Sequence, residues 1–108
     1  MGDDNTTQNV SVGRIAPYRK TLTVTLLTAA ASATLAALKT SALATDLQAI
    51  MLIPSSNTDT INWNVGAAAS ALTSVLPPSG LVLPINKDLA DTIYLFADSK
   101  DVTLVELG

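Results

Sequence analysis

The sequence predicts an all-β protein, an antiparallel β-sandwich or jelly-roll-like barrel of seven to eight short strands with one short helical segment near residues 33–44. Short runs of Val, Ile, Leu and Thr recur at fairly even spacing. Clusters of Pro, Gly, Asn, Asp and Ser separate these runs, as turns do between strands. In addition, 48% of the residues are hydrophobic and only 14% are charged, which is a folding composition.

The 108 residues are enough for one domain with its own core. Residues 1–9 are polar and without periodicity, and residues 10–16 alternate weakly before Pro17, which predicts a short strand. We therefore expect an extended N-terminal arm over residues 1–20 and a β-sandwich domain over residues 21–108.

The first half of the domain holds two expected strands. In residues 21–28, Leu and Val alternate with Thr, the period-2 pattern of a half-buried strand. Residues 29–45 are rich in Ala, with Leu at helical spacings, and predict one or two helical turns. The apolar run 47–53, between Asp46 and Pro54, predicts a buried central strand.

The second half holds the remaining strands, at residues 61–66, 71–76, 81–85, 92–97 and 102–107. Pro77–Gly80 predict a rigid turn with a left-handed residue at Gly80. Pro84 lacks a backbone N–H, so the run 81–85 is expected at a sheet edge. The last two runs predict a closing hairpin around Asp98–Asp101.

An uncharged stretch of eighteen residues, 21–38, has the length of a membrane span, but its repeated Thr residues and strand-like alternation predict no membrane segment. Arg19 and Lys20 followed by Ala42–Ala44 resemble a secretory signal. The long polar start and Lys39 argue against this interpretation.

The absence of His and Cys excludes catalytic triads, thiolate nucleophiles and Cys/His zinc sites. Residues 46–108 carry seven acidic and two basic side chains, which argues against nucleic-acid binding. The sequence therefore predicts a protein that is not an enzyme and holds no cofactor or metal.

Acidic pairs and a lone tryptophan are the remaining chemical candidates. The pairs Asp88/Asp91 and Asp98/Asp101 are three residues apart, but turn capping explains them better than a metal site. Trp63 between Asn62 and Asn64 is a possible sugar-stacking platform. The alternation instead places Trp63 on one face with Ile61 and Val65, toward the core.

The second half contains four short motifs in a fixed order: an Ile-x-x-x-Val-Gly strand, a Leu-Pro turn, a Leu-x-Leu-Pro segment and an Ile-Tyr-Leu-x-Ala strand. Their residues are Ile61, Val65, Gly66, Leu76, Pro77, Gly80, Leu81, Leu83, Pro84, Ile93, Tyr94, Leu95 and Ala97. In this order of motifs, the second half resembles small structural proteins of tailed-phage virions, of the capsid decoration or cement type. The resemblance extends over about residues 21–108 and leaves residues 1–20 unmatched.

The resemblance implies a capsid decoration protein, made in the host cytoplasm and located on the virion surface. Its partners would be the major capsid protein and sister copies, in a homodimer or homotrimer. The alternatives are a tail or head–tail junction protein of a phage, or a carbohydrate-binding module.

Two groups of residues are candidates for partner contacts. The only basic cluster consists of Arg14, Arg19 and Lys20, with Tyr18 in the same segment, and it suits an acidic neighbour or is simply a solvated loop. Tyr94 and Phe96 lie on the face of their strand opposite Ile93 and Leu95, so both faces carry large apolar groups.

Overall fold

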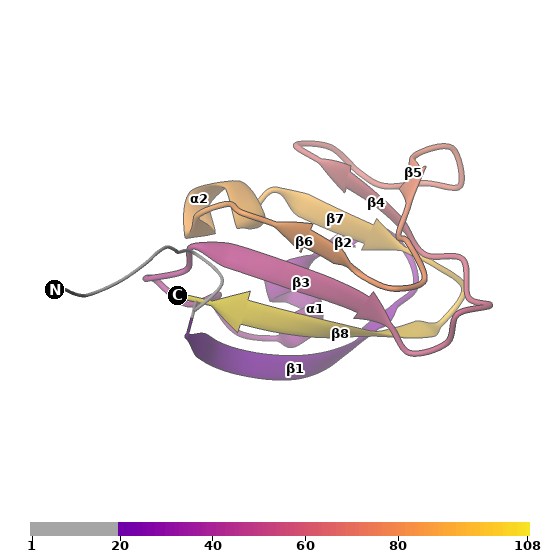
Figure 1. Ribbon diagram of the computed structural model, residues 1–108. Helices are drawn as coiled ribbons and strands as arrows, with labels where there is room; N and C mark the ends of the chain where they lie inside the picture. Colours follow the sequence, from indigo (N-terminus) through magenta and orange to yellow (C-terminus); the bar gives the residue numbers. More distant parts are fainter. Residues whose placement is uncertain (1–19) are drawn as a thin grey trace, which may run out of the picture.

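The computed structural model describes residues 20–108, which form two antiparallel four-stranded sheets and two short helices (Figure 1). The first sheet, sheet A, contains β1 (Thr21–Ala29), β8 (Lys100–Leu107), β3 (Ala49–Pro54) and β6 (Leu81–Leu83). The second, sheet B, contains β2 (Ala33–Thr34), β7 (Ile93–Phe96), β4 (Asn62–Val65) and β5 (Ser74–Val75). The predicted all-β sandwich is thus confirmed.

The strand order is that of a jelly roll. Sheet A has the order β1-β8-β3-β6 and sheet B the order β2-β7-β4-β5. The pairs β1·β8, β2·β7, β3·β6 and β4·β5 are those of one long hairpin, folded at the link between β4 and β5 and rolled into two layers. In each layer a late strand lies between two strands from earlier in the chain. β8 lies between β1 and β3, and β7 lies between β2 and β4.

The predicted closing hairpin is wrong. β7 lies in sheet B and β8 in sheet A, so residues 92–97 and 102–107 do not pair with each other. The chain crosses from one layer to the other at Asp98 and Ser99, and Ser99 has a positive φ of 53°. Leu95 of β7 and Leu104 of β8 are both fully buried and belong to the core cluster between the two sheets.

The first strand is present, but the face that it buries is the opposite of the one that its alternation suggests. Val24 and Leu26 are each 63% exposed, whereas Leu27 and Ala29 are buried. Leu27 and Ala29 lie on the same side of the strand as the threonines before them. Because these two residues fill the core, the leucine and valine that alternate with threonine point outward.

Two short helices interrupt the strands. Within the predicted helical segment, α1 (Leu35–Lys39) begins at Thr34, whose hydroxyl accepts a hydrogen bond from Ala37 N at 3.3 Å. It ends at Thr40, which has a left-handed backbone. The second helix, α2 (Lys87–Ala90), lies between the expected strands 81–85 and 92–97, and Asn86 caps its N-terminus in the same way.

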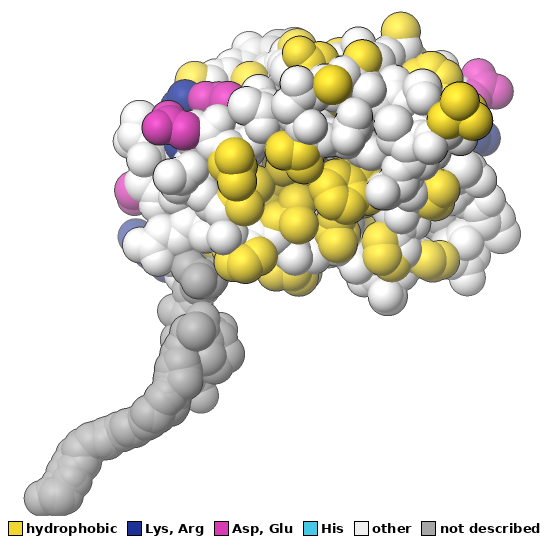
Figure 2. Space-filling view, turned by 90° about the horizontal axis from the view of Figure 1, so that it is seen from above, with side chains coloured by type: hydrophobic (Ala, Val, Ile, Leu, Met, Phe, Trp, Pro, Cys, Tyr) yellow, Lys and Arg dark blue, Asp and Glu magenta, His cyan; other side chains and the backbone are white. Residues whose placement is uncertain are grey.

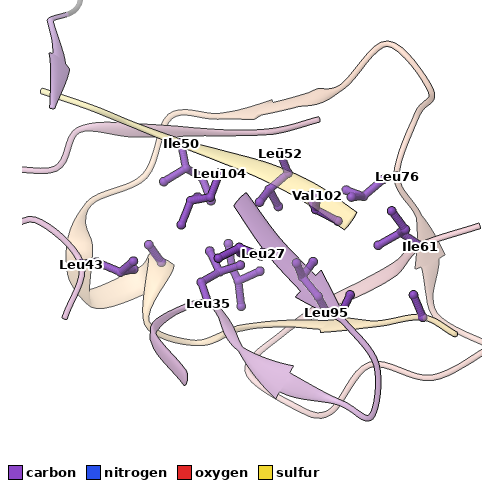
Figure 3. Packing of buried hydrophobic residues seen from close by; sticks show 14 of the residues in the cluster. Leu27, Leu35, Leu43, Ile50, Leu52, Ile61, Leu76, Leu95, Val102 and Leu104 are labelled. Atoms are coloured by element: carbon purple, nitrogen blue, oxygen red, sulfur yellow. The ribbon is translucent and has the colours of Figure 1, made fainter. Parts of the chain in front are cut away.

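The core lies between the two sheets and is built mainly from leucine and isoleucine (Figure 3). Leu27 of β1 and Leu35 of α1 meet there with side chains from both sheets. The helix α1 contacts both β1 and β2, the edge strands on one side of the sandwich. It therefore closes the gap between the layers on that side.

Several turn and edge predictions are confirmed. Gly80 has a φ of 101°, and its N–H donates to Pro77 O at 2.9 Å. β6 is an edge strand that ends just before Pro84, and β3 is an inner strand. The predicted strand 10–16 and all of the predicted arm 1–20 except Lys20 lie outside the described residues.

Candidate interaction surface

Only Lys20 of the basic cluster belongs to the described part of the chain; Arg14 and Arg19, and Tyr18 in the same segment, lie outside it. Lys20 is exposed, and its N–H and C=O exchange hydrogen bonds with Gly108 at 3.0 and 2.8 Å. The backbone of Lys20 therefore extends the pairing of β1 with β8.

The predicted aromatic contacts, Tyr94 and Phe96, lie on the outer face of sheet B. Both are partly buried, while Ile93 and Leu95 on the other face of β7 are fully buried, as the alternation predicts. Tyr94 is the Cα partner of Asn64, and Phe96 that of Asn62. The structure thus does not bring Tyr94 and Phe96 together with Lys20, which extends sheet A.

The tryptophan platform is not free to hold a sugar in the way that the sequence allows. Trp63 pairs with Leu95 on the inner face, is partly buried and packs against the core. The Asn62 amide is buried and donates to Thr73 O at 2.9 Å, and the Asn64 amide donates to Ala68 O at 3.2 Å. These two donors tie the segment after β4 back to the strand.

Seen from above, over the side of the sandwich where β6 and β4 lie, hydrophobic side chains gather across the middle of the face (Figure 2). On the core side of these strands, Leu81, Leu83, Ile85 and Trp63 are partly buried and pack against the central cluster. The sandwich is thus more open here than on the side that α1 closes.

The largest exposed apolar side chains of sheet A lie on its outer face. A row of direct Cα partners crosses all four strands, and each of its members is apolar. In strand order the row is Val24, Val105, Met51 and Val82. Val24 and Val82 at its two ends are 63% and 56% exposed. Because exposed apolar groups gathered on one surface mark interaction sites, this face is the candidate functional surface.

Charge is nearly absent from this outer face. Alternation places Asp101 there at one end, where it accepts a hydrogen bond from the Thr28 hydroxyl at 2.9 Å. The other acidic group of β8, Glu106, lies on the inner face. The row of four apolar residues is therefore available to a partner without the desolvation of a charge.

A buried ion pair lies on the inner face of sheet A, and the sequence did not reveal it. The Glu106 side chain has no solvent exposure, and Lys39 of α1 donates to its Oε2 at 2.6 Å. The Thr23 hydroxyl donates to the same oxygen, and Ala44 N donates to Oε1 at 2.7 Å. Two signals pointed to this pair: Glu106 follows Val102 and Leu104 on one strand face, and Lys39 is the lone charge of residues 21–45.

The surroundings of Glu106 determine how it titrates. Burial alone would raise the pKa of this carboxyl, but the hydrogen bonds from Lys39, Thr23 and Ala44 together hold the pKa below its ordinary value. Glu106 is thus ionised in the folded protein at neutral pH. Since Glu106 is closed off from solvent and bonds to Lys39, Thr23 and Ala44 within the fold, its role is to join α1 to β8.

Two of the other acidic residues, Asp91 and Asp59, also have basic partners. Lys87 and Asp91 form an ion pair at 2.7 Å across α2, and Asp59 lies 3.9 Å from Lys100. The hydrogen bond with Asp91 raises the pKa of Lys87. Within residues 20–108 no three acidic side chains come together as a metal site would require, and neither helix is long and apolar enough to span a membrane.

A small polar pocket is lined by Thr45, Asn86, Lys87 and Asp88. It has no buried charged group. Comparison with known proteins adds no candidate, because no family model, no curated protein and no solved structure matches the chain.

Proposed function

We propose that this chain is a non-enzymatic structural protein of a tailed-phage virion, a capsid decoration protein that binds assembled major capsid subunits and stabilises the shell. The observation that carries the proposal is the outer face of sheet A, where exposed Val24 and Val82 end an uncharged row across four strands. Such a face suits a broad, shape-based contact and offers no side chain for catalysis.

Two further points support the capsid as the partner. The order of the sequence motifs in the second half resembles that of small phage structural proteins. The jelly-roll topology is also one that recurs in viral capsid domains. A partner that binds only assembled subunits would stabilise the shell by mass action.

The sugar-binding alternative loses its supports in this geometry. A carbohydrate platform needs an accessible aromatic ring with free polar neighbours. Here Trp63 packs on the core, while Asn62 and Asn64 donate to backbone carbonyls of the following segment.

The test is to add the purified protein to capsids stripped of accessory proteins and to measure the temperature at which the shells break. We expect saturating protein to raise that temperature. An unchanged temperature would contradict the proposal. Counting copies per particle then separates shell from tail: a number in proportion to the capsid subunits supports decoration, and a single ring supports the head–tail junction.

Two valines provide a matched test of the surface. Val82 on β6 and Val75 on β5 are both on edge strands, and they are 56% and 53% exposed. We expect Val82→Lys to weaken capsid binding, because it places a charge on the outer face of sheet A. Val75→Lys in sheet B should bind as the unmodified protein does. Equal effects would mean that the face of sheet A is not the binding surface.

A further inference from the structure

The four sheet edges within residues 20–108 differ greatly in how they are protected. β2 and β5 have two residues each, and β6 has three residues and stops before Pro84. The fourth edge, β1, is nine residues long. Proteins usually shorten, charge or cover an edge strand, because its free backbone groups pair readily with another strand. β1 has neither a charge nor a proline. The helix α1 contacts β1 where it closes the gap between the layers, but it leaves Val24 and Leu26 on the outer face 63% exposed.

The hydrogen bonds of β8 show which groups of β1 point away from the sheet. Gln48 N and Ser55 N donate to Leu107 O and Asp101 O, so the odd-numbered residues of β8 direct their backbone groups toward β3 and its flanks. In an antiparallel ladder the direction alternates from residue to residue. The even-numbered residues of β8 therefore direct theirs toward β1.

The partners on β1 follow from the register. Thr23, Thr25 and Leu27 lie opposite even-numbered residues of β8 and bond to that strand. Val24 and Leu26 lie opposite odd-numbered residues, so their N–H and C=O groups point to the free edge. Among the residues that the structure describes, no hydrogen bond reaches these groups.

We propose that β1 pairs with β1 of a second copy of this chain, antiparallel and about a twofold axis at Thr25. This axis places Thr25 opposite Thr25 of the second copy, at a pair that makes no hydrogen bonds of its own. It places Val24 opposite Leu26 of the second copy, and the reverse. The free backbone groups of Val24 and Leu26 then meet their counterparts.

This register also covers the most exposed apolar side chains of β1. Val24 and Leu26 are both 63% exposed and lie on the outer face. Opposed residues in an antiparallel pair have side chains in contact, and apolar pairs stabilise the sheet. Since β1 contains no charge, the pairing brings no like charges together along its length.

The charges beyond the strand favour the antiparallel direction. Lys20 precedes β1, and Asp101 lies beside Thr28 near its other end. Antiparallel pairing places Lys20 of each copy at the Asp101 end of the other, whereas parallel pairing would bring the two lysines together. Lys100, also at the Asp101 end, is near Asp59 at 3.9 Å.

The expected contact is small. A nine-residue strand is about 30 Å long, and a sheet is about 10 Å thick, so each copy would bury about 300 Å². The total of about 600 Å² lies below the size of stable interfaces. We therefore expect a weak dimer in solution, which forms more completely where copies are concentrated.

This inference extends the proposed function, because two paired copies would join their outer faces into one eight-stranded apolar surface for the capsid. Its test uses the purified chain without capsids. A failure of dimer formation therefore leaves the capsid proposal standing, and the reverse also holds.

The first experiment measures mass by sedimentation equilibrium at concentrations up to about 1 mM. We expect a monomer–dimer equilibrium for the unmodified chain and a dissociation constant at least about tenfold higher for Leu26→Lys. Val82→Lys is the matched control, since it adds the same charge to the same face at the opposite edge. An unmodified chain that stays monomeric overturns the proposal, as does equal weakening by both variants.

The second experiment tests the axis. The chain has no cysteine, so Thr25→Cys introduces a single thiol. The two Cα atoms of a non-hydrogen-bonded pair are about 4.5 Å apart, within the range of a disulfide. We expect mild oxidation to crosslink Thr25→Cys and to leave Val82→Cys mainly uncrosslinked. Equal crosslinking of the two variants, or none in Thr25→Cys, overturns the Thr25 axis.

Discussion

The inner and outer faces of sheet A differ in a way that polarity alone would not suggest. The inner face includes a fully buried carboxylate, Glu106, with Lys39 as its partner. The outer face has exposed aliphatic residues, with Val24 and Leu26 each 63% exposed. A charge is thus inside and valine is outside. Contacts from other elements, rather than side-chain type, therefore decide which face of a strand is buried.

The largest expected effect comes from removing the partner of the buried charge. Lys39→Met should lower the free energy of unfolding by about 3–5 kcal/mol, because it leaves Glu106 buried without a counter-charge. Urea denaturation at pH 7 measures this. The double variant Lys39→Met with Glu106→Gln removes both charges and should be more stable than Lys39→Met alone. If Lys39→Met lowers the free energy of unfolding by less than about 1 kcal/mol, the Glu106 carboxylate does not depend on Lys39 as its counter-charge.

A cavity on the inner face comes next. Leu104 of β8 is fully buried, so Leu104→Ala should lower the free energy of unfolding by about 2–5 kcal/mol, because it removes buried apolar surface and leaves a cavity. Val105 is its neighbour on the outer face of the same strand and is only partly buried. We expect Val105→Ala to cost clearly less in the same denaturation experiment. Similar losses for both variants would mean that the two faces of β8 contribute equally to the stability of the fold.

The pH dependence of stability tests the charge on the inner face. The pKa of Glu106 is lower in the folded protein than its ordinary value of 4.5. The stability that its ionised form contributes is therefore complete above about pH 4.5, and it is lost as the pH falls through the lowered folded value. Between pH 7 and pH 3, the free energy of unfolding should fall more steeply for the unmodified chain than for Glu106→Gln. Parallel curves for the two proteins would show that the ionised form of Glu106 does not stabilise the fold.

The smallest effect is expected on the outer face. Val24→Thr and Val82→Thr keep the size of the side chain and should change the free energy of unfolding by less than about 0.5 kcal/mol. Val102→Thr is the same change on the inner face. It should lower the free energy of unfolding by about 1–3 kcal/mol, because it buries a hydroxyl. Thermal or urea denaturation of the three variants tests this order. A large loss for Val24→Thr would mean that its side chain is needed by the fold itself.

Local sequence signals located most of the strands. Alternation and turn residues marked β1, β4 and β7, and the dense apolar run marked β3. Pro84 marked the edge position of β6, and Gly80 the turn before it. The helix α2 was missed because four residues give too little periodicity, although the Asn86 cap was present as a signal.

The candidate surface was less accessible to sequence reasoning. Tyr94 and Phe96 were placed on the outer face of their strand, where they lie, but the exposed face of sheet A was not foreseen. That face combines residues from four strands whose pairing is non-local: Val24 and Val105 are 81 positions apart in the chain, yet they are direct Cα partners. Alternation along one strand contains no information on such neighbours.

Composition and short-range periodicity are enough to predict the all-β class, the approximate strand positions and the absence of His and Cys chemistry. The placement of β7 and β8 in different sheets, and the outward direction of the valine and leucine of β1, depend on how the sheets pack. The same packing brings Lys39 to Glu106 inside. The reason is physical: a period of two defines two faces of a strand, but only the packing of distant segments determines which face is buried.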